Sequence, residues 1–276
     1  MLFFDRSGKT ASAQISTYLL EKSRVTHVGP GERSYHVFYG LFALPAAELA
    51  KLKLAPSKSK YLYLAHGEEM PPAQAKVLND DADAAYAAQG IDQADRQAWN
   101  ALLAGVLHLG NLQFDPTNEE LATLLPAGTE ALAAAEACLG LPSDGTLTRA
   151  LTTRKIKAGL DMVQQALRRQ QAADSRDALA RAIFGKLFDL LRDKINIALT
   201  AKSAGGINER RTIGVVDIFG FEVFKVNSLE QLCINFTNEK LQKLFTKFVF
   251  EETIRAYEAD GIKADAISYV DNEQLL

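Results

Sequence analysis

The feature that most constrains this chain is the apolar run at residues 212–222, Thr212-Ile-Gly-Val-Val-Asp-Ile-Phe-Gly-Phe-Glu222. Its β-branched and aromatic residues predict a buried strand that delivers an acid, Asp217, and a glycine, Gly220, to one point at its end. A carboxylate can orient metal-bound water, and an amide without a neighbouring Cβ can approach a phosphate closely. The run therefore indicates a Mg-nucleotide site. The alternative is a strand ending in a turn, where Asp217 only caps a backbone amide.

Composition narrows the class of protein. With 276 residues, 47% of them hydrophobic and 24% charged, the chain is long enough for a core and too mixed in polarity to be disordered. A formal net charge of -3 argues against a nucleic-acid partner bound through bulk charge. Cys138 and Cys233 are the only cysteines, so we expect neither a disulfide framework nor a zinc site, and a reducing setting fits. No apolar run is long enough to span a membrane.

Residues 1–24 predict a β-hairpin whose neighbouring strands come from elsewhere in the chain. Leu2-Phe3-Phe4 is strand-like, a turn-like segment follows, and residues 13–19 alternate as a second strand. Gly8-Lys9-Thr10 imitates the end of a phosphate-binding loop, but the first glycine of that motif would fall at Phe3. Lys9 is therefore interpreted as a solvated turn lysine.

Helical periodicity dominates residues 25–211. Residues 35–54 have a helical pattern that Pro45 divides into two helices, and residues 95–109 have another. Residues 175–200 form a long amphipathic helix. Its predicted apolar stripe consists of Leu179, Ile183, Leu187, Leu190, Leu191 and Ile195. We expect this block to be one helical subdomain inserted between strands of a shared sheet, so that the chain is not modular.

A second long helix is predicted at residues 228–260. Ser228 and Gln231 have the spacing of a capping box, apolar residues then recur at helical intervals, and no helix breaker occurs before Gly261. At about 1.5 Å per residue, such a helix reaches roughly 50 Å, so it serves as a strut as well as a core element.

Single residues of chemical interest are interpreted as structural. His36 and His108 lie within helical apolar stretches and are expected to be packed or hydrogen-bonded rather than catalytic. Trp99 is expected in the core or an interface.

Several motifs together resemble the myosin motor domain. Asp217-Ile-Phe-Gly-Phe-Glu222 and the following Asn227-Ser-Leu-Glu-Gln-Leu-Cys-Ile-Asn-Phe-Thr-Asn-Glu-Lys-Leu-Gln242 are similar to its switch II loop and relay helix. Other stretches match in the same order: Tyr18-Leu-Leu-Glu-Lys-Ser-Arg-Val25, Gly31-Glu-Arg-Ser-Tyr-His-Val-Phe-Tyr39, Leu107-His-Leu-Gly-Asn111, Arg154-Lys-Ile-Lys-Ala-Gly159 and Asp177-Ala-Leu-Ala-Arg181. The resemblance covers essentially the whole chain.

The resemblance implies a fold. It is an α/β, predominantly helical, incomplete P-loop-NTPase-type motor with a few strands of the central sheet. Residues 1–24 would be a sheet hairpin and residues 25–211 a large helical upper 50 kDa region. Residues 212–222 would be the switch II strand and loop, residues 228–260 the relay helix, and residues 261–276 the start of the next segment.

The resemblance also implies roles in a nucleotide site. Asp217 would hold a magnesium ion through bound water, and the Gly220 amide would bond the γ-phosphate of ATP. Ile218 and Phe219 would complete the nucleotide-facing loop. Glu222 would form a salt bridge with an arginine of switch I and help to position the attacking water.

A second implied site touches actin. Residues 152–165 resemble the cardiomyopathy loop, and Arg154, Lys155 and Lys157 give it the positive charge that suits an acidic filament. Asp161 precedes the Asp-Ala-Leu-Ala motif at the spacing where the family carries an acidic or phosphorylatable residue, so this position would be permanently negative. The alternative is a solvated loop with ordinary charges.

The family pattern also predicts what these residues cannot do alone. The chain has no Gly-x-x-x-x-Gly-Lys-Ser/Thr loop, and switch I would lie before Leu2. The chain is therefore interpreted as a central fragment of a motor that couples ATP binding and hydrolysis to actin binding and force production. We expect no ATP hydrolysis from it alone, because Glu222 lacks its arginine and the triphosphate lacks its cradle.

In the complete motor the implied cofactors are ATP and Mg²⁺. The implied partners are the actin filament and the remainder of the heavy chain, with light chains or calmodulin bound only outside these residues. The implied location is cytoplasmic, on the actin cytoskeleton within a myosin complex. Two alternatives stay open: a non-catalytic actin-binding or scaffold protein derived from a myosin head, and an unrelated nucleotide switch with a Walker-B-like strand.

Overall fold

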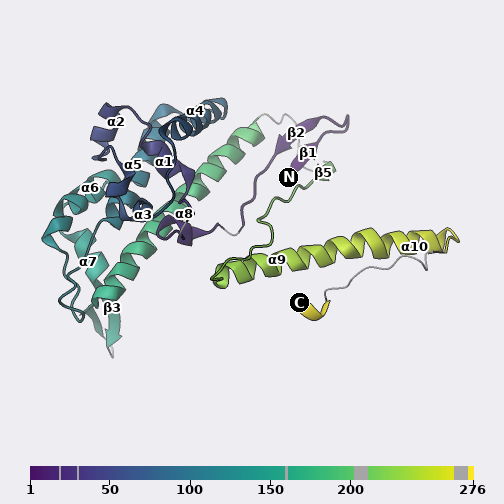
Figure 1. The fold of residues 1–276 in the computed structure, drawn as a ribbon. Helices are drawn as coiled ribbons and strands as arrows, with labels where there is room; N and C mark the ends of the chain where they lie inside the picture. Colours follow the sequence, from purple (N-terminus) through teal and green to yellow (C-terminus); the bar gives the residue numbers. More distant parts are fainter. Residues whose placement is uncertain (19, 30, 159–160, 202–210, 264–272) are drawn as a thin grey trace. The chain divides into compact units, whose positions relative to one another are not determined.

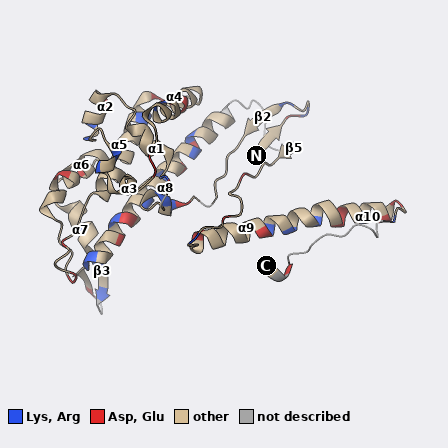
Figure 2. Cartoon of the chain, in the orientation of Figure 1, with Lys and Arg blue, Asp and Glu red and all other residues tan. Residues whose placement is uncertain are grey.

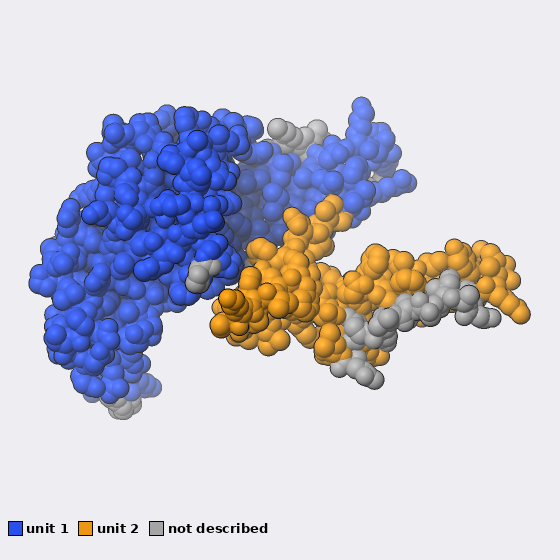
Figure 3. Space-filling model, viewed as in Figure 1, with its two compact units in different colours: residues 1–213 blue, residues 214–276 orange. Residues whose placement is uncertain are grey.

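The computed structural model describes residues 1–18, 20–29, 31–158, 161–201, 211–263 and 273–276. The chain divides into two compact units, Met1–Ile213 and Gly214–Leu276, which Figure 3 colours separately. The expectation of a chain without modules is wrong in this respect. Strand pairing ends at Ile213, and the residues that follow are bonded to a helix of their own unit.

A small sheet brings the two ends of the first unit together. β1 (Leu2–Phe4) pairs antiparallel with β2 (Thr10–Ala13) on one side and with β5 (Arg211–Ile213) on the other, as Figure 1 shows. The helical block lies between β2 and β5 in the sequence. Its flanking strands therefore belong to one sheet, which confirms the prediction of an inserted block.

The hairpin is confirmed, but its second strand is not where the alternation placed it. Strand pairing ends at Ala13, so residues 14–18 of the predicted strand at 13–19 are not strand, and residue 19 lies outside the described residues. The reason is a tight turn. Asp5 Oδ1 accepts hydrogen bonds from the backbone N–H groups of Ser7 and Lys9, which returns the chain early.

The predicted strand at residues 212–222 is much shorter than expected. β5 ends at Ile213, and Val215 and Val216 beyond it are 74% and 72% exposed. β1 is the only described neighbour of β5 and is three residues long, so the hydrogen-bonded ladder stops there. The expectation of a buried strand is therefore wrong, because these side chains have no facing layer in their own unit to pack against.

The core of the first unit is helical, so the unit is predominantly helical with small sheets, as predicted. Its helices are α1 (His36–Leu41), α2 (Ala46–Lys51), α3 (Leu62–Ala65), α4 (Pro72–Ala88), α5 (Gln93–Gly110), α6 (Thr129–Leu139), α7 (Thr146–Thr152) and α8 (Arg169–Ala201). Short 3₁₀ turns lie at Lys22–Val25, Lys58–Lys60 and Pro126–Gly128. Pro45 separates α1 from α2, which confirms the predicted division.

Helix α5 is the central element of this core. It begins at the N-cap Asp92, whose side chain accepts a hydrogen bond from the backbone of Asp95, and its second half is buried throughout. It packs against α6 and α8. Two glycines permit this close packing, because a Cβ at Gly105 would stand 2.6 Å from Leu139 and one at Gly110 would stand 2.8 Å from Tyr63.

The structural interpretations of single residues hold with one exception. Trp99 is buried in α5, and His108 is buried with its Nε2 2.9 Å from the carbonyl oxygen of Leu52. His36 is exposed at the start of α1, so its predicted packing is wrong. On α8 the predicted stripe includes Leu190, which is 44% exposed. Cys138 and Cys233 are free thiols.

The second unit contains one long helical path. α9 (Leu229–Thr246) continues through a π-helical turn (Lys247–Glu251) into α10 (Glu252–Ala259), and a 3₁₀ turn lies at Glu273–Leu275. The predicted capping box is present: Gln231 accepts a hydrogen bond from the Ser228 backbone N–H. The extent of the helix is therefore confirmed, whereas its π-helical interruption was not predicted. In the part of the chain that the structure describes, no helix is long and apolar enough to cross a membrane.

Candidate functional site

The loop after β5 is held on helix α9 by asparagine side chains. The Glu222 backbone N–H donates to Asn235 Oδ1 at 2.8 Å, and Asn235 Nδ2 donates to the Glu222 carbonyl oxygen at 2.7 Å. One turn further along, Asn238 Nδ2 donates to the Phe219 carbonyl oxygen at 2.9 Å. A primary amide has both a donor and an acceptor, so Asn235 pairs with the backbone N–H and C=O of one residue, as a residue of a neighbouring strand would.

The side chain of Glu222 faces the start of the same helix. Gln231 Nε2 lies 3.5 Å from Glu222 Oε2. The same glutamine accepts the N-cap backbone hydrogen bond through its Oε1. Glu222 has no arginine partner among the described residues, and the role that the sequence suggested for it stays a prediction.

Asp217 and Gly220 lie on the open side of this loop. Asp217 is exposed, and its carboxylate has no hydrogen bond or ion pair with any described residue. A Cβ at Gly220 would meet no atom within 4 Å. Ile218 lies between them and is half-buried, whereas Phe219 is 53% exposed. The loop thus exposes an acid without a described partner and, three residues later, a glycine with open space beside it.

This donor set fits a metal that arrives with its nucleotide. Among the described residues no cluster of three or more histidine, cysteine, aspartate or glutamate side chains could hold a metal ion. Mg²⁺ keeps several of its waters and is usually bound through one or two carboxylates and the substrate phosphates. The single carboxylate of Asp217 suits that mode and not a dedicated metal site.

The second candidate segment is a β-hairpin and not a loop. β3 (Thr153–Ala158) pairs antiparallel with β4 (Asp161–Ala166), and residues 159–160 between them lie outside the described residues. Only the Lys-Ile-Lys-Ala part of β3 alternates between polar and apolar residues, whereas β4 does not, so the sequence carried little signal of the hairpin. Every residue of β4 is exposed.

The hairpin places the candidate residues on two faces. Arg154 and Asp161 belong to one face, whereas Lys155 and Lys157 belong to the other, because side chains alternate along a strand. Arg154 Nε donates to Gln165 Oε1 at 2.9 Å across the hairpin. Lys155 and Lys157 have no ion pair with a described residue, so their ammonium groups are available to a partner. Figure 2 shows basic residues along β3.

A backbone hydrogen bond and two ion pairs hold the base of this hairpin. Leu167 N–H donates to the Thr152 carbonyl oxygen at 2.8 Å, which closes the hairpin onto the end of α7. Arg168 and Arg169 then pair with Glu120 and Glu119 at 3.1 and 2.7 Å. These two arginines are therefore neutralised by the chain itself, in contrast to the two lysines.

Asp177, in the Asp-Ala-Leu-Ala motif, joins three elements. Its Oδ1 accepts hydrogen bonds from the Tyr63 hydroxyl at 2.6 Å and from Arg176 Nε at 2.8 Å. Arg176 in turn donates to the carbonyl oxygen of Leu112, just beyond α5. Burial is the main cause that raises the pKa of Tyr63, so its hydroxyl stays protonated and acts as a donor.

Comparison with known proteins gives one family. Residues 1–276 match the family model described as myosin head (motor domain). Myosin-2 of Arabidopsis thaliana is 39% identical over 282 residues, covering 100% of this chain and 22% of the relative. Unconventional myosin-Ic of Rattus norvegicus is 39% identical over 278 residues, covering 98% of this chain and 26% of the relative.

A third relative supports the same family. Unconventional myosin heavy chain 6 of Caenorhabditis elegans is 38% identical over 277 residues, which cover 98% of this chain and 13% of the relative. The chain thus spans about a quarter or less of the length of these relatives.

Proposed function

Since this chain belongs to the myosin head family, we propose that it is a central part of an actin-based motor that couples ATP binding and hydrolysis to actin binding and force production. The observation that carries the proposal is the loop at residues 217–222. It exposes an acid and an open glycine, while asparagine side chains hold its backbone on α9.

In this proposal the loop belongs to the nucleotide site of a P-loop-NTPase-type motor. Asp217 orients water on the magnesium ion that accompanies ATP, and the Gly220 amide donates to the terminal phosphate. Asn235 holds the backbone of Glu222, whose carboxylate lies 3.5 Å from Gln231 Nε2 at the start of α9. When bound, Mg-ATP supplies the phosphoryl group that is cleaved and the charge that the loop senses.

Helix α9 then carries the state of the loop away from the site. Asn235 and Asn238 hold both ends of the segment from Phe219 to Glu222, so a displacement of the loop displaces their helix. A hydrogen bond of this kind contributes about 0.5–1.5 kcal/mol, which makes the attachment firm but reversible. This arrangement supports the role of a relay for α9 and α10.

The experiment is steady-state phosphate release from a whole motor head that contains these residues. Gly220→Ala is expected to reduce release by at least about a hundredfold, because the added methyl group stands where the phosphate must approach the amide. Gly214→Ala is the matched control, since its added Cβ also meets no atom within 4 Å but lies before the acid. Equal loss in both variants, or none in either, would contradict the proposed site.

The same assay tests the chain by itself. Glu222 has no arginine partner among the described residues, and the sequence has no phosphate-cradling loop. Residues 1–276 are therefore proposed not to hydrolyse ATP alone, and their phosphate release should equal that of buffer. Turnover by the isolated chain would refute this part of the proposal.

We also propose that the β3–β4 hairpin contacts the actin filament, because Lys155 and Lys157 extend unpaired charge on an exposed strand. In cosedimentation of a whole head with actin, Lys155→Glu is expected to weaken binding by roughly tenfold at low salt. Lys186→Glu, an exposed site on α8, is the charge-matched control. Unchanged binding of Lys155→Glu would remove the hairpin from the interface, and a non-catalytic scaffold would show the same contact without ATPase activity.

A further inference from the structure

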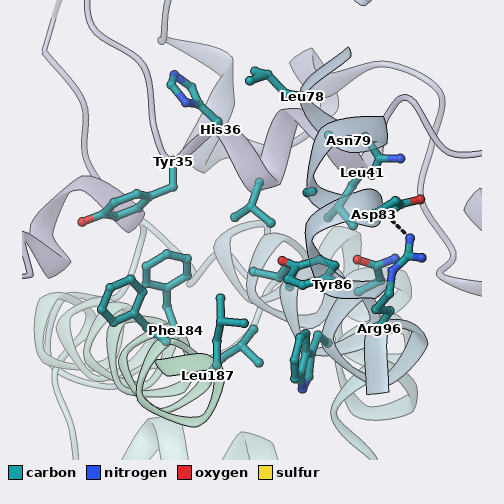
Figure 4. Close-up of a pocket in the computed structure, with 18 residues that line it drawn as sticks. Tyr35, His36, Leu41, Leu78, Asn79, Asp83, Tyr86, Arg96, Phe184 and Leu187 are labelled. Carbon is teal, nitrogen blue, oxygen red and sulfur yellow. Dashed lines mark hydrogen bonds and ion pairs between the residues drawn. The ribbon is translucent and has the colours of Figure 1, made fainter. Parts of the chain in front are cut away.

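The helical unit contains a pocket that the motor chemistry does not use. It lies among α1, α4, α5 and α8 and has a volume of about 370 Å³. Figure 4 shows its labelled side chains arranged around an open centre. Cavities of this size are typical of sites for small organic molecules. The pocket exists because α4 presents a small residue, Ala82, to it, and α1 presents Gly40.

Aromatic side chains form two sides of the pocket. Tyr35 and Phe184 stack with ring centroids 4.6 Å apart and an interplanar angle of 24°. Tyr86 and Trp99 meet edge to face, with centroids 5.6 Å apart and an angle of 74°. Leu41, between these pairs, is almost fully buried. Rings favour other rings in stacked or edge-to-face contact, so this lining suits a flat aromatic molecule.

Charged groups in the lining, and beside one of its rings, are paired within the chain. Arg96 forms an ion pair with Asp83 and lies 5.8 Å from the centroid of the Tyr86 ring. Lys194 likewise pairs with Asp95 and lies 6.0 Å from the centroid of the Trp99 ring. A charged ligand would lose its hydration without finding an unpaired counter-charge, whereas a neutral ligand has no such cost.

The hydroxyl of the pocket tyrosine also stays uncharged. Tyr35 donates its hydroxyl proton to the Glu21 carbonyl oxygen at 2.9 Å, and burial raises its pKa to about 12. The lining at neutral pH is therefore apolar and aromatic with a neutral balance of charge. Asn79 and Asn100 supply uncharged hydrogen-bonding groups at the edge.

We propose that this pocket is a binding site for an uncharged small molecule with two aromatic ring systems. Such a molecule inserts between the Tyr35–Phe184 pair and the Tyr86–Trp99 pair and excludes water from the Ala82 side of α4. The site is independent of the loop at residues 217–222, which belongs to the other unit.

The test uses the only tryptophan of the chain as the reporter. Residues 1–276 are titrated with N-phenylnaphthylamine, an uncharged probe with two aromatic ring systems, a naphthyl and a phenyl group, and energy transfer from Trp99 to the probe is measured. Anilinonaphthalene sulfonate has the same rings with an added anion, and we expect it to bind at least about tenfold more weakly. Saturable transfer to the neutral probe is the expected result.

Two substitutions in α4 test whether the probe binds in this pocket. Ala82→Phe fills the pocket and is expected to weaken probe binding by at least about tenfold. Ala84→Phe places the same ring on the exposed side of the helix and should bind as the unchanged chain does. Equal affinities of the two variants, or stronger binding of the sulfonate, would overturn the proposal. So would loss of the signal in a whole motor head, because a polypeptide segment would then cover the pocket.

Discussion

Asn235 shows how much one side chain can decide at the scale of a residue. The sequence identifies the acid and the glycine after β5, but nothing in it shows that an asparagine more than ten positions later pairs with the backbone of Glu222. Asparagine within a helix usually lowers helix propensity slightly, and a tertiary role such as this one accounts for its presence. The roles of Asp217, Gly220 and Glu222 stay predictions, and the hydrogen bonds that hold the loop could not be predicted from the sequence.

His108 gives the chain a predictable response to acid. Burial is the main cause that lowers its pKa below the usual 6.5, with the Leu52 carbonyl acting in the opposite direction. The folded state thus favours neutral His108, so its stabilising contribution is complete above pH 6.5 and is lost as pH falls below it. The free energy of unfolding in urea should decrease from about pH 7.5 to about pH 5.5, before most carboxylates titrate.

The control for this prediction is His108→Gln, whose amide can still donate to the Leu52 carbonyl but does not titrate. Its free energy of unfolding should change less over the same interval. The other three histidines, His27, His36 and His66, are exposed. If the variant loses as much stability as the unchanged chain, the acid response arises elsewhere.

At the scale of elements, a sequence pattern can predict a helix without predicting what the helix contacts. Periodicity predicted α5, α8 and the path of α9 and α10, because each carries apolar residues at helical spacing. It missed the β3–β4 hairpin, whose exposed strands carry few apolar residues. It also overextended the strand at residues 212–222, since an apolar run becomes a strand only beside a partner of equal length.

Two glycines inside helices provide a matched prediction. Gly105→Ala in α5 would place a Cβ 2.6 Å from the Leu139 side chain, and we expect a loss of about 1–3 kcal/mol in the free energy of unfolding. Gly185→Ala in α8 meets only the end of the flexible Lys22 side chain at 2.9 Å. It should be neutral, or stabilising by up to about 1 kcal/mol through helix propensity.

Urea denaturation of both variants under the same conditions measures the difference. Only Gly105→Ala should lower the free energy of unfolding, whatever the exact size of the two changes. If Gly185→Ala lowers the free energy of unfolding as much as Gly105→Ala does, helix α8 tolerates no added methyl group. That result would contradict our expectation that the Lys22 side chain moves aside.

At the scale of the whole molecule, the two units differ in how much they bury. The helical unit has a continuous core around α5, whereas in the described part of the second unit only Ile234 and Thr246 are buried. Several large apolar side chains of the second unit are exposed, namely Leu229, Leu232, Phe236, Leu244, Phe245 and Phe248. Exposed apolar stripes of this kind mark surfaces that pack against other polypeptide.

Amide hydrogen exchange should therefore divide the chain. In residues 1–276 the amides of α5 are expected to exchange slowly, because they open only when the core unfolds. The amides of α9 and α10 are expected to exchange fast in this chain and slowly in a whole head, where other segments can cover them. Equal protection of α5 and α9 in the isolated chain would contradict this reading of the two units.

The sequence by itself determined the family, the helical class and the capped long helix, because these depend on local propensity and motif spacing. Only the tertiary structure decided where the strands end, which side chains support the loop, and that Lys155 and Lys157 share one face of a hairpin. The physical reason is that a strand, a buried histidine or a pocket is defined by what lies beside it. Those neighbours are far apart in the sequence and meet only in the folded chain.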